Sequence, residues 1–206
     1  LVMGLYDDKK NVPADGAEVQ VQESKTFDEI SYALSIRDSL VYLAGEIDEY
    51  TVTELIARMR IVIDNRGPKM AKEPMNLIID SHGGCAYSMF GIIDYIESIA
   101  PDIKVNTICR GRAFSAAALI LASGTGTRYA SKRSTIMLHE GSSAQVGKYS
   151  DLKVASKQAD KMEAMVRNLL AQKTKKDEAW WEDNLKTDLW LDSPEALDLG
   201  IIDEIG

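Results

Sequence analysis

Apolar segments of two kinds alternate along this sequence of 206 residues, and that alternation restricts the fold more than any other feature. Short runs rich in Val, Ile and Leu have the length of buried strands, at 40–43, 76–80, 103–109 and 135–138. Helical patterns, in which apolar residues recur every three or four positions, follow at 50–65, 87–100, 115–123 and 149–172. Strands that alternate with helices are typical of an α/β domain with mostly parallel strands.

Local signals set the limits of the domain. Thr26 and Glu29 have the spacing of a capping box, which predicts a short helix beginning there. Ser193 as N-cap, Pro194 at the first helical position and Gly200 after the end predict a last helix. We therefore expect one domain at 24–206, preceded by a mobile arm at 1–23 with a short strand at 19–21.

Composition argues against several classes of function. Lys and Arg number 24 and Asp and Glu number 32, so the net charge of −8 gives no electrostatic reason to bind nucleic acid. No apolar run approaches the roughly 18 residues that cross a membrane, and no basic segment with an apolar run behind it suggests a signal peptide. Two cysteines without a CxxC or His-x-x-x-His pattern predict no disulfide framework, metal site or cofactor, and favour the cytoplasm.

Two histidines and one serine are the first candidates for chemistry. His139 closes the strand at 135–138, where a side chain can leave the core and face a cleft, and a structural histidine is the alternative. His82 is the other histidine of the chain. Ser115 lies after a strand among small residues at a helix start, where the helix dipole favours developing negative charge. An ordinary helix serine is the alternative.

A glycine pair and one aspartate complete the set. Gly83 and Gly84 follow a buried strand and precede a helix, so their backbone N–H groups could hold an oxyanion, hold a phosphate or simply make a tight turn. Asp188, in the segment 187–191, is a candidate acid, with a solvated loop carboxylate as its alternative. Taken singly these residues indicate a hydrolase without excluding the other uses.

Taken together and in order, these segments resemble the proteolytic subunit of the Clp protease (ClpP). The family pattern of a strand, Ser-Pro-Gly-Gly and a helix is similar to residues 79–84, and its Gly-x-Ala-x-Ser is similar to residues 111–115. The likeness continues at the histidine motif, 137–140, and at the aspartate segment, 188–196. Two more segments, 122–130 and 200–203, extend it, so that the resemblance covers about 40–205.

The resemblance implies a fold and an activity. The fold is ClpP/crotonase-like, with repeated strand-strand-helix units and a protruding strand-helix handle at about 141–172. The activity is that of a serine endopeptidase on unfolded proteins or peptides, with Ser115 as nucleophile, His139 as general base and Asp188 as the orienting acid. The N–H groups of Gly84 and Ala116 would form the oxyanion hole, with Gly83 shaping the turn. Seven subunits would form a ring, and two rings would stack through the handles into a tetradecamer that encloses the active sites.

The sequence departs from the family pattern at several positions, so other interpretations of its function stay open. His82 replaces the proline before the glycine pair. The strand at 76–79 lacks the aromatic residues that dock the ATPase partner in typical members, which argues against docking of a Clp-type ATPase. The rivals are a catalytically silent structural ring subunit and a crotonase-type acyl-CoA enzyme. A Ser–Lys mechanism with Lys132 is a third.

Overall fold

The structure is a computed structural model that describes residues 26–142 and 146–206. Strands and helices alternate along the chain, as the sequence predicts. In chain order the elements are α1 (Phe27–Asp38), β1 (Leu40–Ile47), α2 (Glu49–Asn65), β2 (Met75–Gly84), α3 (Ala86–Ile99), β3 (Val105–Phe114), α4 (Ala116–Ala122), β4 (Arg128–Ala130), β5 (Thr135–Leu138), α5 (Tyr149–Lys173), α6 (Glu178–Asn184), β6 (Leu189–Leu191), α7 (Ser193–Leu199) and β7 (Glu204–Ile205). The arm predicted at 1–23 and its strand at 19–21 lie outside the described residues.

The strands of the described residues belong to one sheet. Its main path runs β1-β2-β3-β4-β7, and each neighbouring pair on this path is parallel. Strand β5 lies parallel to the end of β3, and β6 pairs with β5 in the antiparallel sense. Parallel neighbours need long crossover connections, and helices supply several of them here. The predicted α/β architecture with mostly parallel strands is therefore confirmed.

Strand β3 has two successive partners along one flank. Residues 107–109 pair with β4, and residues 112–114 pair with β5. On the other flank, the register between β2 and β3 shifts between Ile79 and Ser81. The end of β3 that leads into Ser115 is thereby tied to β5, the strand that leads into His139.

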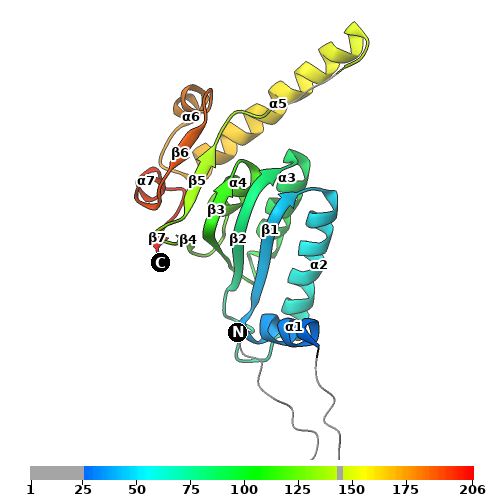
Figure 1. Ribbon diagram of the computed structural model, residues 1–206, viewed down its shortest axis with the longest axis vertical. Helices are drawn as coiled ribbons and strands as arrows, with labels where there is room; N and C mark the ends of the chain where they lie inside the picture. The colour runs from blue at the N-terminus through cyan, green and yellow to red at the C-terminus, as the bar shows by residue number, and fades with distance from the viewer. Residues whose placement is uncertain (1–25, 143–145) are drawn as a thin grey trace, which may run out of the picture.

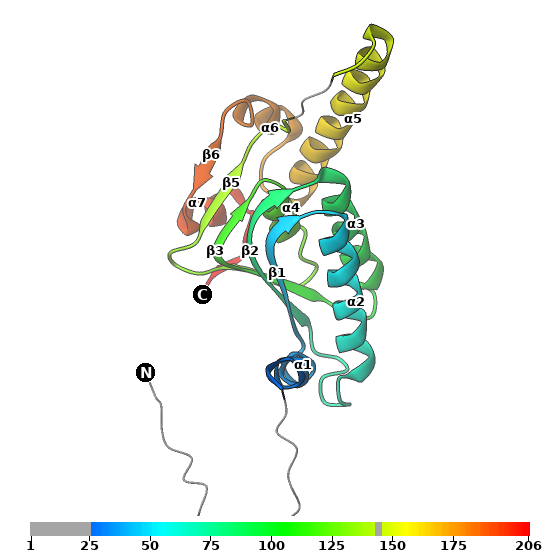
Figure 2. The same cartoon turned by 45° about the vertical axis from the view of Figure 1, so that its right-hand side comes forward.

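Helices cover the sheet and close the core. Helices α2 and α3 lie side by side along the sheet, and α1 lies at the end of the body opposite α5 (Figures 1 and 2). Helix α4 packs on β2 and β3, and all seven of its residues are buried. The hydrophobic effect thus holds α4 from every side. The largest fully buried side chains include Leu43, Ile47, Met59, Met75, Leu77, Ile79, Met89, Ile92, Ile93, Ile96, Ile120 and Trp181.

Helix α5 projects from the body as the predicted handle (Figure 1). It has 25 residues, of which only Val166 and Leu170, both in its second half, are buried. Its first half instead carries exposed apolar side chains, among them Tyr149 and Val154, which are 75% and 70% exposed. None of the described residues between β5 and α5 belongs to a strand, so the strand part of the predicted handle is not seen among them.

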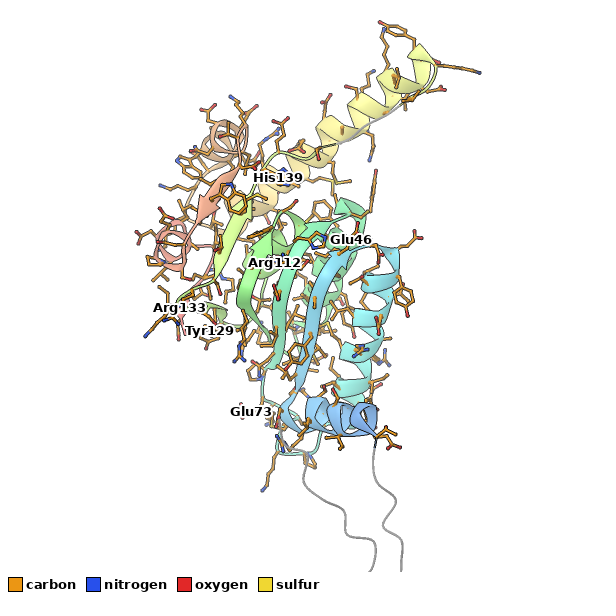
Figure 3. The ribbon with its side chains drawn as sticks, viewed as in Figure 1. Glu46, Glu73, Arg112, Tyr129, Arg133 and His139 are labelled. Atoms are coloured by element: carbon orange, nitrogen blue, oxygen red, sulfur yellow. The ribbon has the colours of Figure 1, made fainter. Side chains whose placement is uncertain are left out.

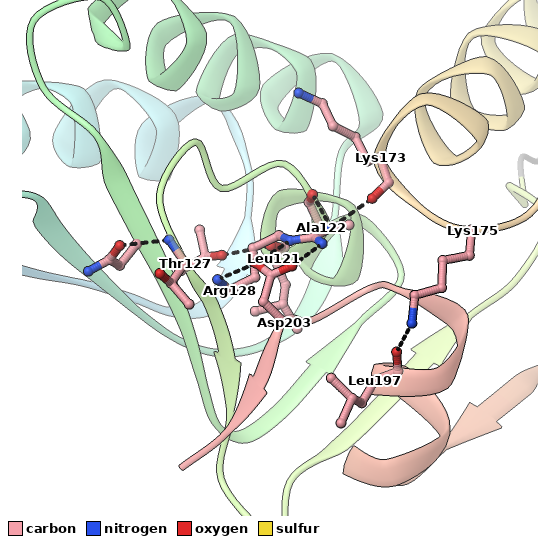
Figure 4. Close-up of polar contacts among 10 residues, drawn as sticks. Leu121, Ala122, Thr127, Arg128, Lys173, Lys175, Leu197 and Asp203 are labelled. Carbon is pink, nitrogen blue, oxygen red and sulfur yellow. Dashed lines mark hydrogen bonds and ion pairs between the residues drawn. The ribbon is translucent and has the colours of Figure 1, made fainter.

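Arg128 anchors the base of the handle to the body (Figure 4). Its guanidinium donates to the carbonyl of Lys173 at 2.7 Å, at the end of α5, and to that of Ala122 at 3.2 Å. The same group pairs with the carboxylate of Asp203, and this hydrogen bond lowers the pKa of Asp203. Only 14% of the Arg128 side chain is exposed, so the arginine is largely sheltered from water, although its partner Asp203 is 40% exposed. One residue therefore joins the ends of two helices to the segment before β7.

Local boundaries differ from the sequence predictions in several ways. Strand β2 includes Gly83 and Gly84, which were expected to follow it, and β3 continues past Gly111 to Phe114. The capping box of Thr26 and Glu29 is confirmed, whereas the N-cap of α7 is Asp192 rather than Ser193. The Asp192 carboxylate accepts from the N–H of Glu195, while the Ser193 hydroxyl donates to the carbonyl of Ser131 at 2.7 Å. The sequence predictions also missed β4, β6 and β7, because strands of two or three residues are too short for a periodic pattern.

Candidate active site

Ser115 adopts a backbone conformation that few residues other than glycine can hold. It lies between β3 and α4 with φ 54° and ψ −125°. Its N–H donates to the carbonyl of Met137 at 2.7 Å, which fixes it against β5. A strained conformation of this kind costs on the order of 1–3 kcal/mol and persists only where the surroundings enforce it. The buried helix after Ser115 and the strand before it provide that enforcement, and they leave its side chain half-exposed.

His139 is within hydrogen-bonding distance of this serine. Its Nε2 lies 2.8 Å from the Ser115 hydroxyl oxygen. Figure 3 shows His139 just past the end of β5, beside the lower part of α5. The imidazole is half-buried. The structure therefore brings together two of the three residues that the sequence assigns to a triad, with the geometry that a nucleophile and its base require.

Asp188 lies near this pair but is not joined to it. It directly precedes β6, and the β5–β6 register, which pairs Leu138 with Leu189, sets Asp188 opposite His139 when continued by one residue. The aspartate is exposed, and among the described residues no hydrogen bond links it to the imidazole. Trp190 holds β6 in place, since its ring packs edge-on against Phe114 with centroids 5.2 Å apart.

Gly83 of the glycine pair lies directly against the serine, and Gly84 lies against the Ile47 backbone. A Cβ on Gly83 would come within 2.8 Å of the Ser115 Cβ and 2.6 Å of the Phe114 carbonyl oxygen, and a Cβ on Gly84 would overlap the Ile47 carbonyl. Gly83 also has φ +93°, a conformation that favours glycine. Both positions therefore require glycine, because the backbone passes too close to its neighbours for any side chain.

Ser81 is a supporting residue that the sequence analysis did not single out. Its side chain is fully buried. It donates to the Gly45 carbonyl at 2.5 Å and accepts from the Gly83 N–H at 3.0 Å. These two bonds satisfy backbone groups where the sheet register is irregular. Buried backbone groups need such hydrogen-bond partners. A serine in an otherwise apolar strand is the sequence feature that could have indicated this role.

A cavity of about 580 Å³ opens beside the pair. Ser115 and His139 line it, together with Gly84 and Ala116, the two residues assigned to an oxyanion hole. Its remaining walls come from Cys85 and the start of α3, from Leu119 of α4, from residues 141 and 142, and from α5. Apolar groups dominate these walls, in the form of Met89, Leu119, Ala155, Ala159, Met162 and Val166.

Helix α5 contributes more to this cavity than the sequence analysis anticipated. Its apolar stripe was interpreted as an interface or as internal packing, and Met162 and Val166 of that stripe line the cavity. Gln158 also reaches across and donates to the Tyr87 hydroxyl at 3.2 Å, which links α5 to α3. Neither His82 nor Lys132 is among the described residues that line the cavity. A Ser–Lys mechanism therefore has no support from this geometry.

The two cysteines have opposite environments. Cys85 is exposed at the rim of the cavity, and a hydrogen bond from the Ser88 backbone lowers the pKa of its thiol. Cys109 is buried in β3, and burial raises the pKa of its thiol to about 11. A thiolate is the reactive form, so Cys85 is the more reactive thiol of the two.

No group of three or more His, Cys, Asp or Glu side chains among the described residues is placed to hold a metal ion. No described helix combines the length and the apolar character that crossing a bilayer would need.

Comparison with known proteins finds relatives that match this mostly parallel α/β chain over most of its length. The family model for "Clp protease" matches residues 22–206. An ATP-dependent Clp protease proteolytic subunit 2 of Frankia casuarinae is 30% identical over 175 residues, covering 84% of this chain and 78% of the relative. An ATP-dependent Clp protease proteolytic subunit of Porphyromonas gingivalis is 30% identical over 169 residues, covering 82% and 73%.

The chain belongs to the Clp protease family, because the family model covers most of its length. The resemblance inferred from the ordered motifs is thereby confirmed. An identity of 30% to both relatives makes it a divergent member. The membership supports a protease function.

Proposed function

We propose that this chain is a serine endopeptidase in which Ser115 is the nucleophile, His139 the general base and Asp188 the acid that orients the imidazole. The observation that carries the proposal is the 2.8 Å distance between the Ser115 hydroxyl and His139 Nε2 at the edge of a large cavity. The strained backbone of Ser115 adds support, because strain of this kind concentrates at active sites. Membership of the Clp protease family agrees with it.

The reaction follows from these positions. The Ser115 oxygen attacks the peptide carbonyl carbon while its proton passes to His139 Nε2, and the N–H groups of Gly84 and Ala116 stabilise the resulting oxyanion. His139 then returns the proton to the leaving amine, which leaves an acyl-enzyme at Ser115. A water molecule attacks this ester, with His139 again as base, and releases the second product. Asp188 acts by accepting a hydrogen bond from His139 Nδ1, for which its exposed side chain has to turn toward the imidazole.

Assembly is the second part of the proposal. We propose that seven subunits form a ring and that two rings stack through their handles, with the cavities facing an enclosed space. Exposed apolar side chains on the first half of α5 support this arrangement, since contacts between copies would cover them. A Clp-type ATPase is not part of the proposal, because the strand at 76–79 lacks the aromatic residues that docking uses in the family.

Covalent labelling tests the catalytic assignment. A fluorophosphonate, which reacts with activated serines, should modify the wild-type chain once, at Ser115, as located by mass spectrometry of the digested protein. His139→Ala should abolish this reaction, whereas His82→Ala should leave it unchanged. A chain that resists the reagent would contradict the proposal and favour the silent ring subunit or the crotonase-type acyl-CoA enzyme. Thioester turnover in the Ser115→Ala variant would identify the latter.

A further inference from the structure

A carboxylate on the handle is bound to the segment that follows the catalytic histidine. Glu163, in the second half of α5, accepts a hydrogen bond from the backbone N–H of Gly141, with 2.7 Å between the Glu163 Oε1 and the nitrogen. Gly141 stands two residues after His139. Both Glu163 and Gly141 line the cavity that contains Ser115. The bond therefore joins two walls of that cavity.

The close approach depends on glycine at position 141. A Cβ there would lie 2.5 Å from Glu163 Oε1 and 3.7 Å from its Cδ, and it would meet no other atom within 4 Å. Gly141 has no positive φ that would itself demand glycine. The missing side chain at Gly141 thus makes room for one group, the Glu163 carboxylate, and the two residues are matched to each other.

The bond acts at a place where the sheet no longer holds the chain. The β5–β6 ladder ends at the pair Leu138–Leu189, one residue before His139. Beyond that point the Glu140 N–H donates to the Leu185 carbonyl at 2.8 Å, on the side of α6. The Glu163 bond holds the next residue from the side of α5. The backbone after the histidine is therefore held from two sides, and Glu163 provides one of them.

We propose that Glu163 is a positioning residue, which acts through the Gly141 backbone to hold His139 against Ser115 and to fix the adjoining wall of the cavity. This inference rests on the proposed peptidase function. It also gives the handle a part in the chemistry, because a displacement of α5 would move Glu163 and the backbone bound to it. Displacements of about 1 Å at a catalytic group are sufficient to cost about 100-fold in rate.

Conservative and non-conservative variants of Glu163 distinguish a role in positioning His139 from a role in stabilising the fold. Glu163→Ala removes the acceptor and should lower both the rate constant of Ser115 labelling and the kcat for a peptide by about 10- to 100-fold. Glu163→Gln keeps an acceptor oxygen and should restore both to within about threefold of wild type. Asp160→Ala is the matched control, because Asp160 is exposed on the same helix and has no side-chain partner among the described residues. Melting temperature and native mass are measured for each variant.

A second pair of variants keeps the test independent of folding losses. Gly141→Ala should displace the carboxylate and cost about as much activity as Glu163→Ala. The double variant should be no worse than either single one, because all three lose the same bond. Wild-type labelling rates in Glu163→Ala, a failure of Gln to restore activity, or losses that multiply in the double variant would each overturn the inference. A wild-type chain that is never labelled at Ser115 would instead contradict the proposed function itself.

Discussion

The two halves of the candidate active site are built differently. Ser115 stands between a ten-residue strand of the main sheet and a helix whose seven residues are all buried. His139 and Asp188 stand at the ends of β5 and β6, which have four and three residues. Three residue pairs join these short strands, and Asp188 itself is exposed.

Because of this difference, we expect the half that contains Ser115 to be rigid and the half that contains His139 and Asp188 to move more easily. The core enforces the nucleophile's conformation, so Ser115 cannot shift without disturbing buried packing, which tolerates little change. His139 and Asp188 lie just beyond the last pair of the short β5–β6 ladder, where fewer contacts hold the backbone than in the core, and segments with few contacts open at low free-energy cost. Changes in the nucleophile half should therefore affect folding and activity together, whereas changes in the base half should affect activity alone.

The largest effect on activity alone is expected from Asp188→Asn. The variant should fold normally, because Asp188 is exposed, yet its kcat should fall by about 10⁴-fold through loss of the acid that orients the imidazole. Asp183→Asn makes the same chemical change at another exposed position, where only a surface ion pair with Lys186 is lost, and serves as control. Peptide hydrolysis and thermal unfolding measure the two effects. A kcat within tenfold of wild type would remove Asp188 from the triad.

A smaller loss of activity, accompanied by a loss of stability, is expected from Gly83→Ala. The added Cβ would collide with Ser115 and with the Phe114 carbonyl at a backbone conformation that favours glycine. We expect kcat/KM to fall by about 100-fold and the free energy of unfolding by about 1–3 kcal/mol.

Gly91→Ala is the matched control for that change. Gly91 lies within α3, and a Cβ there would make an ordinary contact of 3.4 Å with Val52. Alanine favours helix formation over glycine by roughly 1 kcal/mol, so this variant should be at least as stable as wild type. Urea unfolding of both proteins makes the comparison. A Gly83→Ala protein as stable and active as wild type would show that the nucleophile half is not rigid.

The smallest effect on activity, about tenfold, is expected from charging the exposed half of the handle. Val154→Lys should leave the stability of the single subunit within about 0.5 kcal/mol, because Val154 is 70% exposed. If handles contact one another, the charge should shift the native mass toward smaller particles and reduce hydrolysis. Ser156→Lys, also at an exposed position of α5, controls for charge alone. Native mass spectrometry over a dilution series, together with peptide hydrolysis, compares the two variants. A fully active monomeric wild type would refute the ring proposal.

Sequence patterns predicted the nucleophile half better than the base half. Long periodic segments gave the order of β1–β3 and α2–α5, and the strand-to-helix passage at Gly111–Ser115 drew attention to Ser115 as a candidate nucleophile. His139 became a candidate because it closes an apolar strand. Asp188 came from family resemblance, since β6 is too short to carry a pattern of its own.

Contacts between distant segments account for what the sequence did not reveal. The hydrogen bond from Gly141 to Glu163 joins residues 22 apart, and the ion pair of Arg128 with Asp203 joins residues 75 apart. Neither contact joins residues at the regular spacing of a helix or strand, so no periodic pattern in the sequence indicates it. The side chains of Met162 and Val166 fit a helix stripe equally well whether they face another subunit or the cavity, and only the path of α5 relative to α4 decides between the two.

The positive φ of Ser115 has a consequence for anyone who redesigns this backbone. At φ 54° and ψ −125° a glycine would be free of the steric cost that serine bears. A procedure that scores each position by conformational energy alone would therefore choose glycine at 115 and remove the hydroxyl. Optimising thermal stability and keeping the reaction are opposed objectives at this one residue, so it has to be held fixed while the rest of the scaffold is varied.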